Sequence, residues 1–249
     1  MNNQEIGNQV IKVKSVDSTN NYAAKLLNQT KVPFGTVIMA HYQTNGKGQR
    51  NTIWSSNGGE NLLMSVLLDL SFMPSEKIFF LSKSIALAIR AAVVDVIGIE
   101  SHLKWPNDVL IDNKKIAGVL IENQWNNSNI VSSIVGVGLN VNQVDFQESF
   151  SATSLKKITN KNYNLDNILK VLCKKLNKYY NQLASLNFDN IDTEYHQHLV
   201  NYNKFCEFEE NNILFNAKVK GVNQQGELML EFTNGDVKSY ELKQITQLL

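Results

Sequence analysis

The sequence predicts an α+β fold, in which a mixed, mainly antiparallel sheet carries packed helices and is followed by a small C-terminal SH3-like β-barrel. Three observations predict this class. Short turns join the strand-length apolar segments between residues 102 and 141, which favours antiparallel hairpins over βαβ crossovers. Two long segments carry apolar residues at helical spacing. After residue 203 the chain consists of short alternating strands separated by turn signals.

The N-terminal part of the chain is predicted to begin with a strand and a helix. Residues 10–14 alternate like a half-buried strand, and Asp17-Ser18-Thr19-Asn20 supplies capping side chains for a helix with apolar residues over 22–27. A second strand is predicted over 36–43. A polar, glycine-containing loop follows over 44–57.

The central part of the chain contains the most apolar segments. The continuous apolar run 61–70 is typical of a strand buried on both faces. Ser75 is predicted to cap the longest helix, which Gly98 ends. Three strands are predicted next, over 102–111, 115–122 and 130–141.

A second amphipathic helix is predicted over 166–186. After it, the residue pattern of the chain changes from helical spacing to short alternating segments. Four short strands are predicted after it, over 205–208, 213–222, 228–232 and 237–242. Four strands in fewer than about fifty residues predict a small barrel that packs on the main domain. The predicted domains are therefore residues 1–200 and 201–249.

Composition excludes several classes of protein. The chain has 249 residues, of which 43% are hydrophobic and 19% are charged, and a formal net charge of +1. This balance excludes a disordered chain and gives no general attraction to nucleic acid. The two cysteines, Cys173 and Cys206, have no metal-site or disulfide-framework spacing. Without a membrane-length apolar run or a secretory start, the sequence predicts a cytoplasmic protein without a membrane partner.

The standard nucleotide-binding and hydrolase motifs are absent from the sequence. No stretch matches GxxxxGK[ST], and Gly46-x-Gly48 has Asn51 where a dinucleotide-binding fingerprint needs its third glycine. GxSxG and HExxH are also absent. Any nucleotide chemistry must therefore use another arrangement of residues.

The glycine-containing loop carries two cations and a large aromatic side chain. Lys47 and Arg50 flank Gly48, whose bare backbone lets N–H groups approach an anion, and Trp54 follows. These residues predict an anion-binding loop closed by an aromatic ring. The alternative is a solvated loop with Trp54 in the core.

Polar residues cluster at a proline break in the next apolar segment. Pro106 removes a backbone donor where Lys104, Asn107 and Asp108 gather. Lys104 and Asn107 could hold a phosphate, and Asp108 could bind a magnesium ion. A simple turn at Asn107 and Asp108 is the alternative.

Glycines in the two following apolar runs complete a predicted pocket floor. Lys115 precedes Gly118, and its point charge suits the neutralisation of a carboxylate and a phosphate together. Gly136 and Gly138 mark a close approach to the main chain, or otherwise a twisted strand end. Glu122, at the end of its run, is either a buried polar residue or a surface partner.

In order and spacing these segments resemble the biotin–protein ligases, or biotin–[acetyl-CoA-carboxylase] ligases, over nearly the whole chain. The matching elements are Asp17-Ser18-Thr19-Asn20, Tyr42-Gln43-Thr44 with the glycine loop that ends at Trp54, Lys104-Trp105-Pro106-Asn107-Asp108, Lys115 through Glu122, and Gly136-Val137-Gly138-Leu139-Asn140. As an ordered set they are specific to this family.

The resemblance implies the fold shared by class II aminoacyl-tRNA synthetases and biotin ligases, and a two-step reaction. The carboxylate of biotin attacks the α-phosphorus of ATP, which gives biotinyl-5′-AMP and pyrophosphate. A lysine of a biotin carboxyl carrier protein then attacks the mixed anhydride. ATP and biotin are the implied substrates, Mg²⁺ is the implied cofactor, and the acceptor is a transient partner.

The resemblance also implies roles for individual residues. Lys115, Lys47 and Arg50 would be catalytic. Biotin would bind Ser18, Thr19, Asn20, Gln43, Lys47, Gly48, Gln49, Lys115, Gly118, Gly136 and Gly138. ATP would bind Trp54, Lys104, Asn107, Asp108 and Asn140, and Asp108 would also hold Mg²⁺.

The sequence departs from the family in two places. The commonest family loop reads Gly-Arg-Gly-Arg, whereas Lys47 and Gln49 occupy the arginine positions here, and Arg50 is the candidate for compensation. Some family members are also operon repressors with an N-terminal helix-turn-helix. Here the ligase motifs begin by Asp17, which predicts a short form without DNA binding.

Two other functions fit part of the pattern. A lipoate–protein ligase or octanoyltransferase resembles biotin ligases in fold, but the Lys104–Asp108 string and the C-terminal barrel favour biotin. A non-catalytic protein that binds biotin or its adenylate is the alternative from another class, and the presence of Lys115 counts against it. Edge strands near 115–142 leave a homodimer open.

Overall fold

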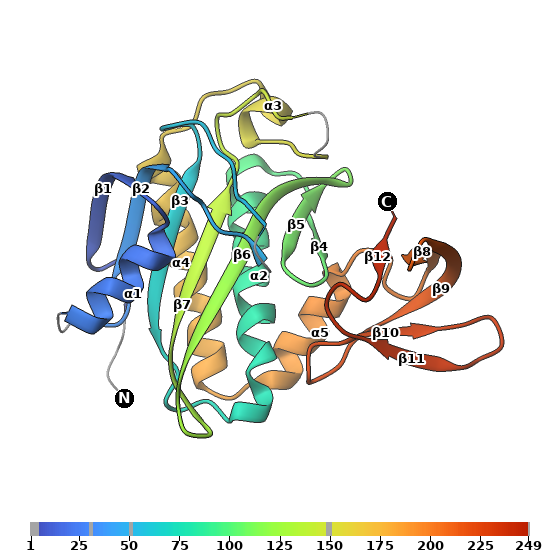
Figure 1. The fold of residues 1–249 in the computed structure, drawn as a ribbon. Coiled ribbons are helices and arrows are strands. Elements are labelled where there is room, and N and C mark those ends of the chain that lie inside the picture. Colours follow the sequence, from blue (N-terminus) through green and yellow to red (C-terminus); the bar gives the residue numbers. More distant parts are fainter. Residues whose placement is uncertain (1–4, 30–31, 50–51, 148–150, 249) are drawn as a thin grey trace.

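The structure, a computed structural model, describes residues 5–29, 32–49, 52–147 and 151–248, so Arg50 lies outside the described residues. Its centre is a seven-stranded sheet in the order β1-β2-β3-β7-β6-β5-β4 (Figure 1). The strands are β1 (Val10–Val16), β2 (Val37–Gln43), β3 (Leu62–Asp69), β4 (His102–Lys104), β5 (Asp108–Ile111), β6 (Lys114–Asn126) and β7 (Asn129–Leu139). Only β1 and β2 pair in parallel among these neighbours, which confirms the predicted mixed, mainly antiparallel sheet.

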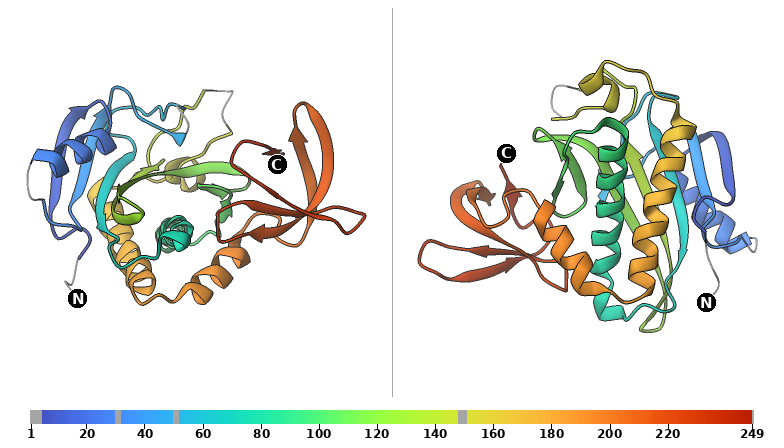
Figure 2. Two further views of the ribbon diagram at one scale, coloured as in Figure 1. Left: turned by 60° about the horizontal axis from the view of Figure 1, so that its bottom comes forward. Right: turned by 180° about the vertical axis from the view of Figure 1, so that it is seen from behind.

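Helices cover both faces of this sheet. Helix α1 (Thr19–Gln29) lies on one face, while α2 (Phe79–Ile97) and α4 (Leu165–Ala184) run side by side across the other (Figures 1 and 2). The remaining helices are the 3₁₀ turn η2 (Ser75–Lys77), α3 (Leu155–Thr159) and α5 (Phe188–His198). None of the helices in the described part of the chain is long and apolar enough to cross a membrane.

The continuous apolar run of β3 is buried because both of its faces are covered. Met64 and Val66 belong to the main core formed with α2 and α4, whereas Leu67 packs with Ala23 of α1 in a second, smaller cluster. Alternate side chains of a strand point to opposite faces. The continuous apolar pattern of residues 61–70 is therefore explained by the helices that cover both sides of the sheet.

Two predictions about the central segments were wrong. The single strand expected over 102–111 is two antiparallel strands, β4 and β5, separated at Trp105-Pro106, where the peptide bond is cis. Pro106 cannot donate to a ladder, so the chain turns there. Ser75 does not cap α2: its hydroxyl donates to the Ser128 carbonyl, and α2 begins at Phe79.

The C-terminal segment forms a second, five-stranded sheet in the order β11-β10-β9-β8-β12, beside β4 and β5 (Figures 1 and 2). Its strands are β8 (Phe205–Glu210), β9 (Ile213–Val222), β10 (Leu228–Glu231), β11 (Val237–Tyr240) and β12 (Thr246–Gln247). Four strands were predicted, but α5 and β12 were not. Helix α5 buries only Ile191 and Tyr195, and β12 is two residues long, so neither leaves a clear periodic signal.

Candidate active site

Glycines on the neighbouring central strands β6 and β7 form the floor of a cavity on the α1 face of the sheet. Gly138 of β7 lies between Leu63 of β3 and Gly118 of β6. The next row of the same face places Gly136 between Ser65 and Leu120. Three of the six positions in these two rows are glycines, Gly118, Gly136 and Gly138, so other groups can approach the backbone closely there.

The indole of Trp54 takes up part of the space above these glycines. A methyl group at Gly138 would overlap the Trp54 ring, and one at Gly118 would lie 2.9 Å from ring atom Cζ3. The indole Nε1 is buried and has no hydrogen-bond partner within the described ranges. Trp54 therefore presents an unused donor inside the cavity.

One end of the cavity is polar and closely hydrogen-bonded. At the start of α1, the backbone N–H of Thr19 donates to Oε1 of Gln43 at 2.8 Å, and its hydroxyl contacts the same oxygen at 3.0 Å. The amide of Asn20 donates to Oε2 of Glu122 at 2.7 Å. Thr19 and Asn20 are both almost fully buried and hydrogen-bonded, so this end offers polar groups that are already held in place to a hydrogen-bonding ligand.

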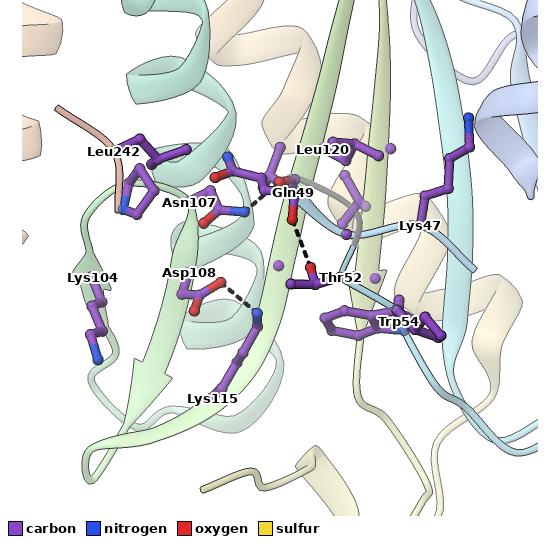
Figure 3. A pocket seen from close by; sticks show the side chains of 18 of the residues that line it. Lys47, Gln49, Thr52, Trp54, Lys104, Asn107, Asp108, Lys115, Leu120 and Leu242 are labelled. Atoms are coloured by element: carbon purple, nitrogen blue, oxygen red, sulfur yellow. Dashed lines mark hydrogen bonds and ion pairs between the residues drawn. The ribbon is translucent and has the colours of Figure 1, made fainter. Parts of the chain in front are cut away.

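The other end of the cavity carries the charges. Nζ of Lys115 lies 2.7 Å from Oδ1 of Asp108 and 5.4 Å from the Trp54 ring centroid. Nζ of Lys104 donates to the Gln247 carbonyl at 3.3 Å, and burial lowers the pKa of Lys104 despite the opposing effect of Asp108. Figure 3 shows Lys115 and Asp108 pointing toward each other, while Lys47 points away from them.

Lys47 instead forms an ion pair with Glu122, which contacts Asn20 at the polar end of the cavity but does not line the cavity itself. Its Nζ lies 3.7 Å from Oε1 of Glu122, and its side chain is 39% exposed. Glu122 thus contacts both Asn20 and the glycine loop, which answers the question that the sequence left open about this residue.

Two asparagines assigned to ATP make structural hydrogen bonds. Nδ2 of Asn107 donates to the Val119 carbonyl at 2.6 Å, which ties the turn before β5 to β6. Asn140 is buried and donates to the Thr153 carbonyl at 3.0 Å. It also does not line the cavity, whereas Asn107 does.

The cavity, of about 550 Å³, brings together most of the residues that the sequence singled out. They are Ser18, Thr19, Asn20, Gln43, Lys47, Gly48, Gln49, Trp54, Lys104, Asn107, Asp108, Lys115, Gly118, Gly136 and Gly138. Asn140 is absent from this lining, and Arg50 is outside the described residues.

Sequence reasoning missed the contribution of the C-terminal sheet to the cavity. Leu228, Leu242, Lys243, Ile245, Thr246 and Gln247 line its charged end. Leu228 lies in β10, Thr246 and Gln247 lie in β12, and the other three lie between β11 and β12, and nothing in these short segments indicates that they pack against the first sheet. Thr52 and Ile53 of the glycine loop were also missed.

Metal-binding capacity in the cavity is limited. Throughout the ranges that the structure describes, no group of three or more His, Cys, Asp or Glu side chains could hold a metal ion. Asp108 is the one carboxylate among the described residues that line this cavity, and Lys115 already contacts it. A single carboxylate suits Mg²⁺ only when a substrate phosphate supplies further oxygens.

Comparisons with known proteins agree with this geometry. Residues 12–140, slightly more than half of the chain, match the biotin/lipoate A/B protein ligase family. The bifunctional ligase/repressor BirA of Bacillus subtilis is 29% identical over 239 residues, covering 94% of this chain and 73% of its own. The biotin–[acetyl-CoA-carboxylase] ligase of Mycobacterium tuberculosis is 34% identical over 127 residues, covering 49% of this chain and 45% of its own.

A solved structure extends the likeness beyond residues 12–140. The biotin protein ligase from Aquifex aeolicus in complex with biotin and ATP superimposes with a TM-score of 0.81 at 26% identity, covering 97% of this chain and 99% of that one. The match therefore includes the C-terminal sheet as well as the cavity. The chain belongs to the biotin/lipoate A/B protein ligase family.

Proposed function

We propose that this protein is a biotin–protein ligase, which activates biotin with ATP and transfers it to a lysine of an acceptor protein. One observation carries the proposal: a single cavity joins a hydrogen-bonding end at Thr19 and Gln43 to a cationic end at Lys104 and Lys115. Biotin has a ureido ring at one end and a carboxylate at the other. The Aquifex aeolicus relative, a biotin protein ligase by name, was solved with biotin and ATP.

The reaction needs two displacements and no nucleophile from the protein. A carboxylate oxygen of biotin bonds to the α-phosphorus of ATP while the bond from that phosphorus to the bridging oxygen breaks, and pyrophosphate leaves. The acceptor amine then attacks the acyl carbon, loses a proton, and AMP leaves. Positioning and charge neutralisation supply most of the rate enhancement in such transfers.

The proposed roles follow from the placement of each side chain. Lys115 would neutralise charge between the carboxylate and the α-phosphate, and Asp108 orients its ammonium group. Trp54, with its unused Nε1 donor, would pack against the adenine. Lys47, Gly48 and Gln49 would close over the biotinyl adenylate and exclude water, and Lys104 would bind phosphate.

Mg²⁺ is proposed to enter with the nucleotide. Asp108 would supply one oxygen ligand and the phosphates of ATP the others, because the cavity offers too few carboxylates for a protein-only site. The ion would withdraw charge from the phosphates of ATP.

The acceptor is proposed to be a biotin carboxyl carrier domain, and the cytoplasm, where ATP is available, the compartment. The division at residues 200 and 201, the homodimer, and the absence of DNA and membrane binding remain predictions. A lipoate or octanoate ligase remains the second candidate function, because the family that matches residues 12–140 includes both activities.

A radiolabel exchange assay tests the proposal. We expect labelled pyrophosphate to enter ATP only when biotin and Mg²⁺ are present, and biotinyl-5′-AMP to accumulate. Lipoate tested side by side should support little exchange. Exchange without biotin, or with lipoate alone, would contradict the proposed function.

A further inference from the structure

A buried serine on the central strand β3 joins the two residues at the polar end of the cavity. Oγ of Ser65 lies 2.7 Å from Oγ1 of Thr19 and 2.6 Å from Oδ1 of Asn20. The serine is fully buried and does not line the cavity, so it acts only through these two side chains. Gly136, its neighbour on β7, makes room for the Asn20 amide, which a methyl group there would overlap.

The orientations of the two amides in this cluster are fixed by their partners. The backbone N–H of Thr19 requires an oxygen from Gln43, not an NH₂ group. The carboxylate of Glu122 accepts from Nδ2 of Asn20 at 2.7 Å, so the oxygen of that amide faces Ser65. A reversed Asn20 amide would set two acceptors against each other.

A count of protons shows what this cluster lacks. Three short oxygen–oxygen contacts link Gln43 to Thr19, Thr19 to Ser65, and Ser65 to Asn20. Each contact needs one proton, but the two hydroxyl groups supply only two. One contact is therefore without a proton in every arrangement, so the cluster favours a ligand that brings N–H donors.

We propose that Ser65 and Glu122 are specificity-determining positioning residues, which hold Thr19, Asn20 and Gln43 in an acceptor-rich arrangement that selects a cyclic ureido group over a dithiolane ring. The ureido group of biotin carries two N–H donors, whereas the dithiolane of lipoate carries none. A site built to hydrogen-bond a ligand strongly rejects an analogue without the matching groups. The inference rests on the proposed function and assigns its selectivity to two residues outside the biotin contacts.

The test measures exchange kinetics for two variants. We expect Ser65→Ala to raise KM for biotin by about 10- to 100-fold, the effect of losing one buried hydrogen-bond partner, with kcat and KM for ATP nearly unchanged. The preference for biotin over lipoate should fall by a similar factor. Glu122→Ala should act in the same direction, and Glu122→Gln, whose amide can still accept from Asn20, should restore most of the affinity.

A matched control separates this role from general packing. Ser133→Ala removes another fully buried serine of the same sheet, whose hydroxyl contacts Oδ1 of Asn123 at 2.5 Å outside the cavity. It should leave both KM values unchanged. Because Ser65 and Glu122 act on one amide, the effects of Ser65→Ala and Glu122→Ala should be less than additive.

Three outcomes bear on the inference. An unchanged KM for biotin in Ser65→Ala, with biotin-dependent exchange in the parent protein, overturns the inference but leaves the proposed function standing. No biotin-dependent exchange in the parent protein overturns the proposed function itself. If Ser65→Ala does not fold, Glu122→Ala decides, because the Glu122 side chain is 41% exposed and tolerates truncation: an unchanged KM for biotin there overturns the inference.

Discussion

The ammonium group of Lys115 lies 2.7 Å from a carboxylate oxygen of Asp108, across the paired strands β5 and β6. The same ammonium group lies 5.4 Å from the ring centroid of Trp54. Lys115 is therefore held at the cationic end of the cavity before any substrate binds. Such preorganisation is the physical basis of electrostatic catalysis, because no reorganisation is needed as charge develops.

Lys115→Ala is expected to lower the rate of biotinyl-adenylate formation by at least about 10²-fold, the usual effect of losing one preorganised electrostatic contact. Single-turnover formation of biotinyl-5′-AMP measures it. Lys114→Ala is the control, because Lys114 is the exposed neighbour on the same strand and does not line the cavity. Turnover near that of the parent protein would remove Lys115 from the mechanism.

Gly138→Ala is expected to displace Trp54 and weaken ATP use. The added methyl group would overlap the indole, and both neighbours of Gly138 in the sheet are fixed by ladder pairing. We expect a red-shifted tryptophan emission and a KM for ATP raised by about tenfold or more, in line with the overpacking of a close contact.

The second variant Trp54→Leu in the Gly138→Ala background checks the cause. Gly138→Ala alone should lower the unfolding temperature, and a smaller side chain at position 54 should relieve the overlap and restore that temperature, while ATP use stays impaired because the ring is gone. An unfolding temperature that stays low would place the damage in the sheet and not in the indole.

The sequence predicted the central sheet and the glycine floor because both depend on local patterns. Gly118, Gly136 and Gly138 interrupt apolar runs, and such interruptions mark close approach of other groups to a strand. Pro106 likewise signalled a break in an apolar segment, although the chain turns back on itself there and does not simply end a strand.

The residues that the sequence could not place depend on contacts between distant segments. Ser65 is a polar residue in a nearly uniform apolar strand. Its hydroxyl has hydrogen-bond partners only because Thr19 and Asn20 of α1 lie against it. Leu242 and Gln247 reach the cavity because the second sheet packs beside β4 and β5. The alternation of apolar and polar residues along a strand shows which side chains share a face. It does not show which part of another domain that face contacts.

Trp105→Phe is expected to loosen the contact between the two sheets. The indole Nε1 donates to the Gly226 carbonyl, in the turn between β9 and β10, at 2.8 Å. Losing this hydrogen bond should lower the free energy of unfolding by about 1 kcal/mol. Hydrogen exchange should rise at the turn over 223–227 more than in α4. Uniform exchange changes across both sheets would contradict a local role.

Asp192→Asn is expected to destabilise the protein in a pH-dependent way. Lys83, only 1% exposed, contacts Asp192 at 2.5 Å, and His196 contacts it at 3.3 Å. Burial raises the pKa of Asp192, but the hydrogen bonds from His196 and Lys83 outweigh this and lower it from 3.8 to about 2. Breaking the pair leaves a buried cation, and we expect a loss of about 1–3 kcal/mol after allowing for the 40% exposure of the carboxylate.

The sign of the pH dependence follows from the lowered pKa. The folded state binds the Asp192 proton less readily than the unfolded chain, so this stabilisation is complete above pH 3.8 and is lost as the pH falls toward 2. Urea unfolding at a series of pH values should give a difference between parent and Asp192→Asn that shrinks as the pH falls below about 4. Asp95→Asn, which breaks the ion pair with Lys175 at a 51% exposed carboxylate, should cost less than about 1 kcal/mol. A difference that is undiminished at pH 2 would show that Asp192 contributes through packing and not through its charge.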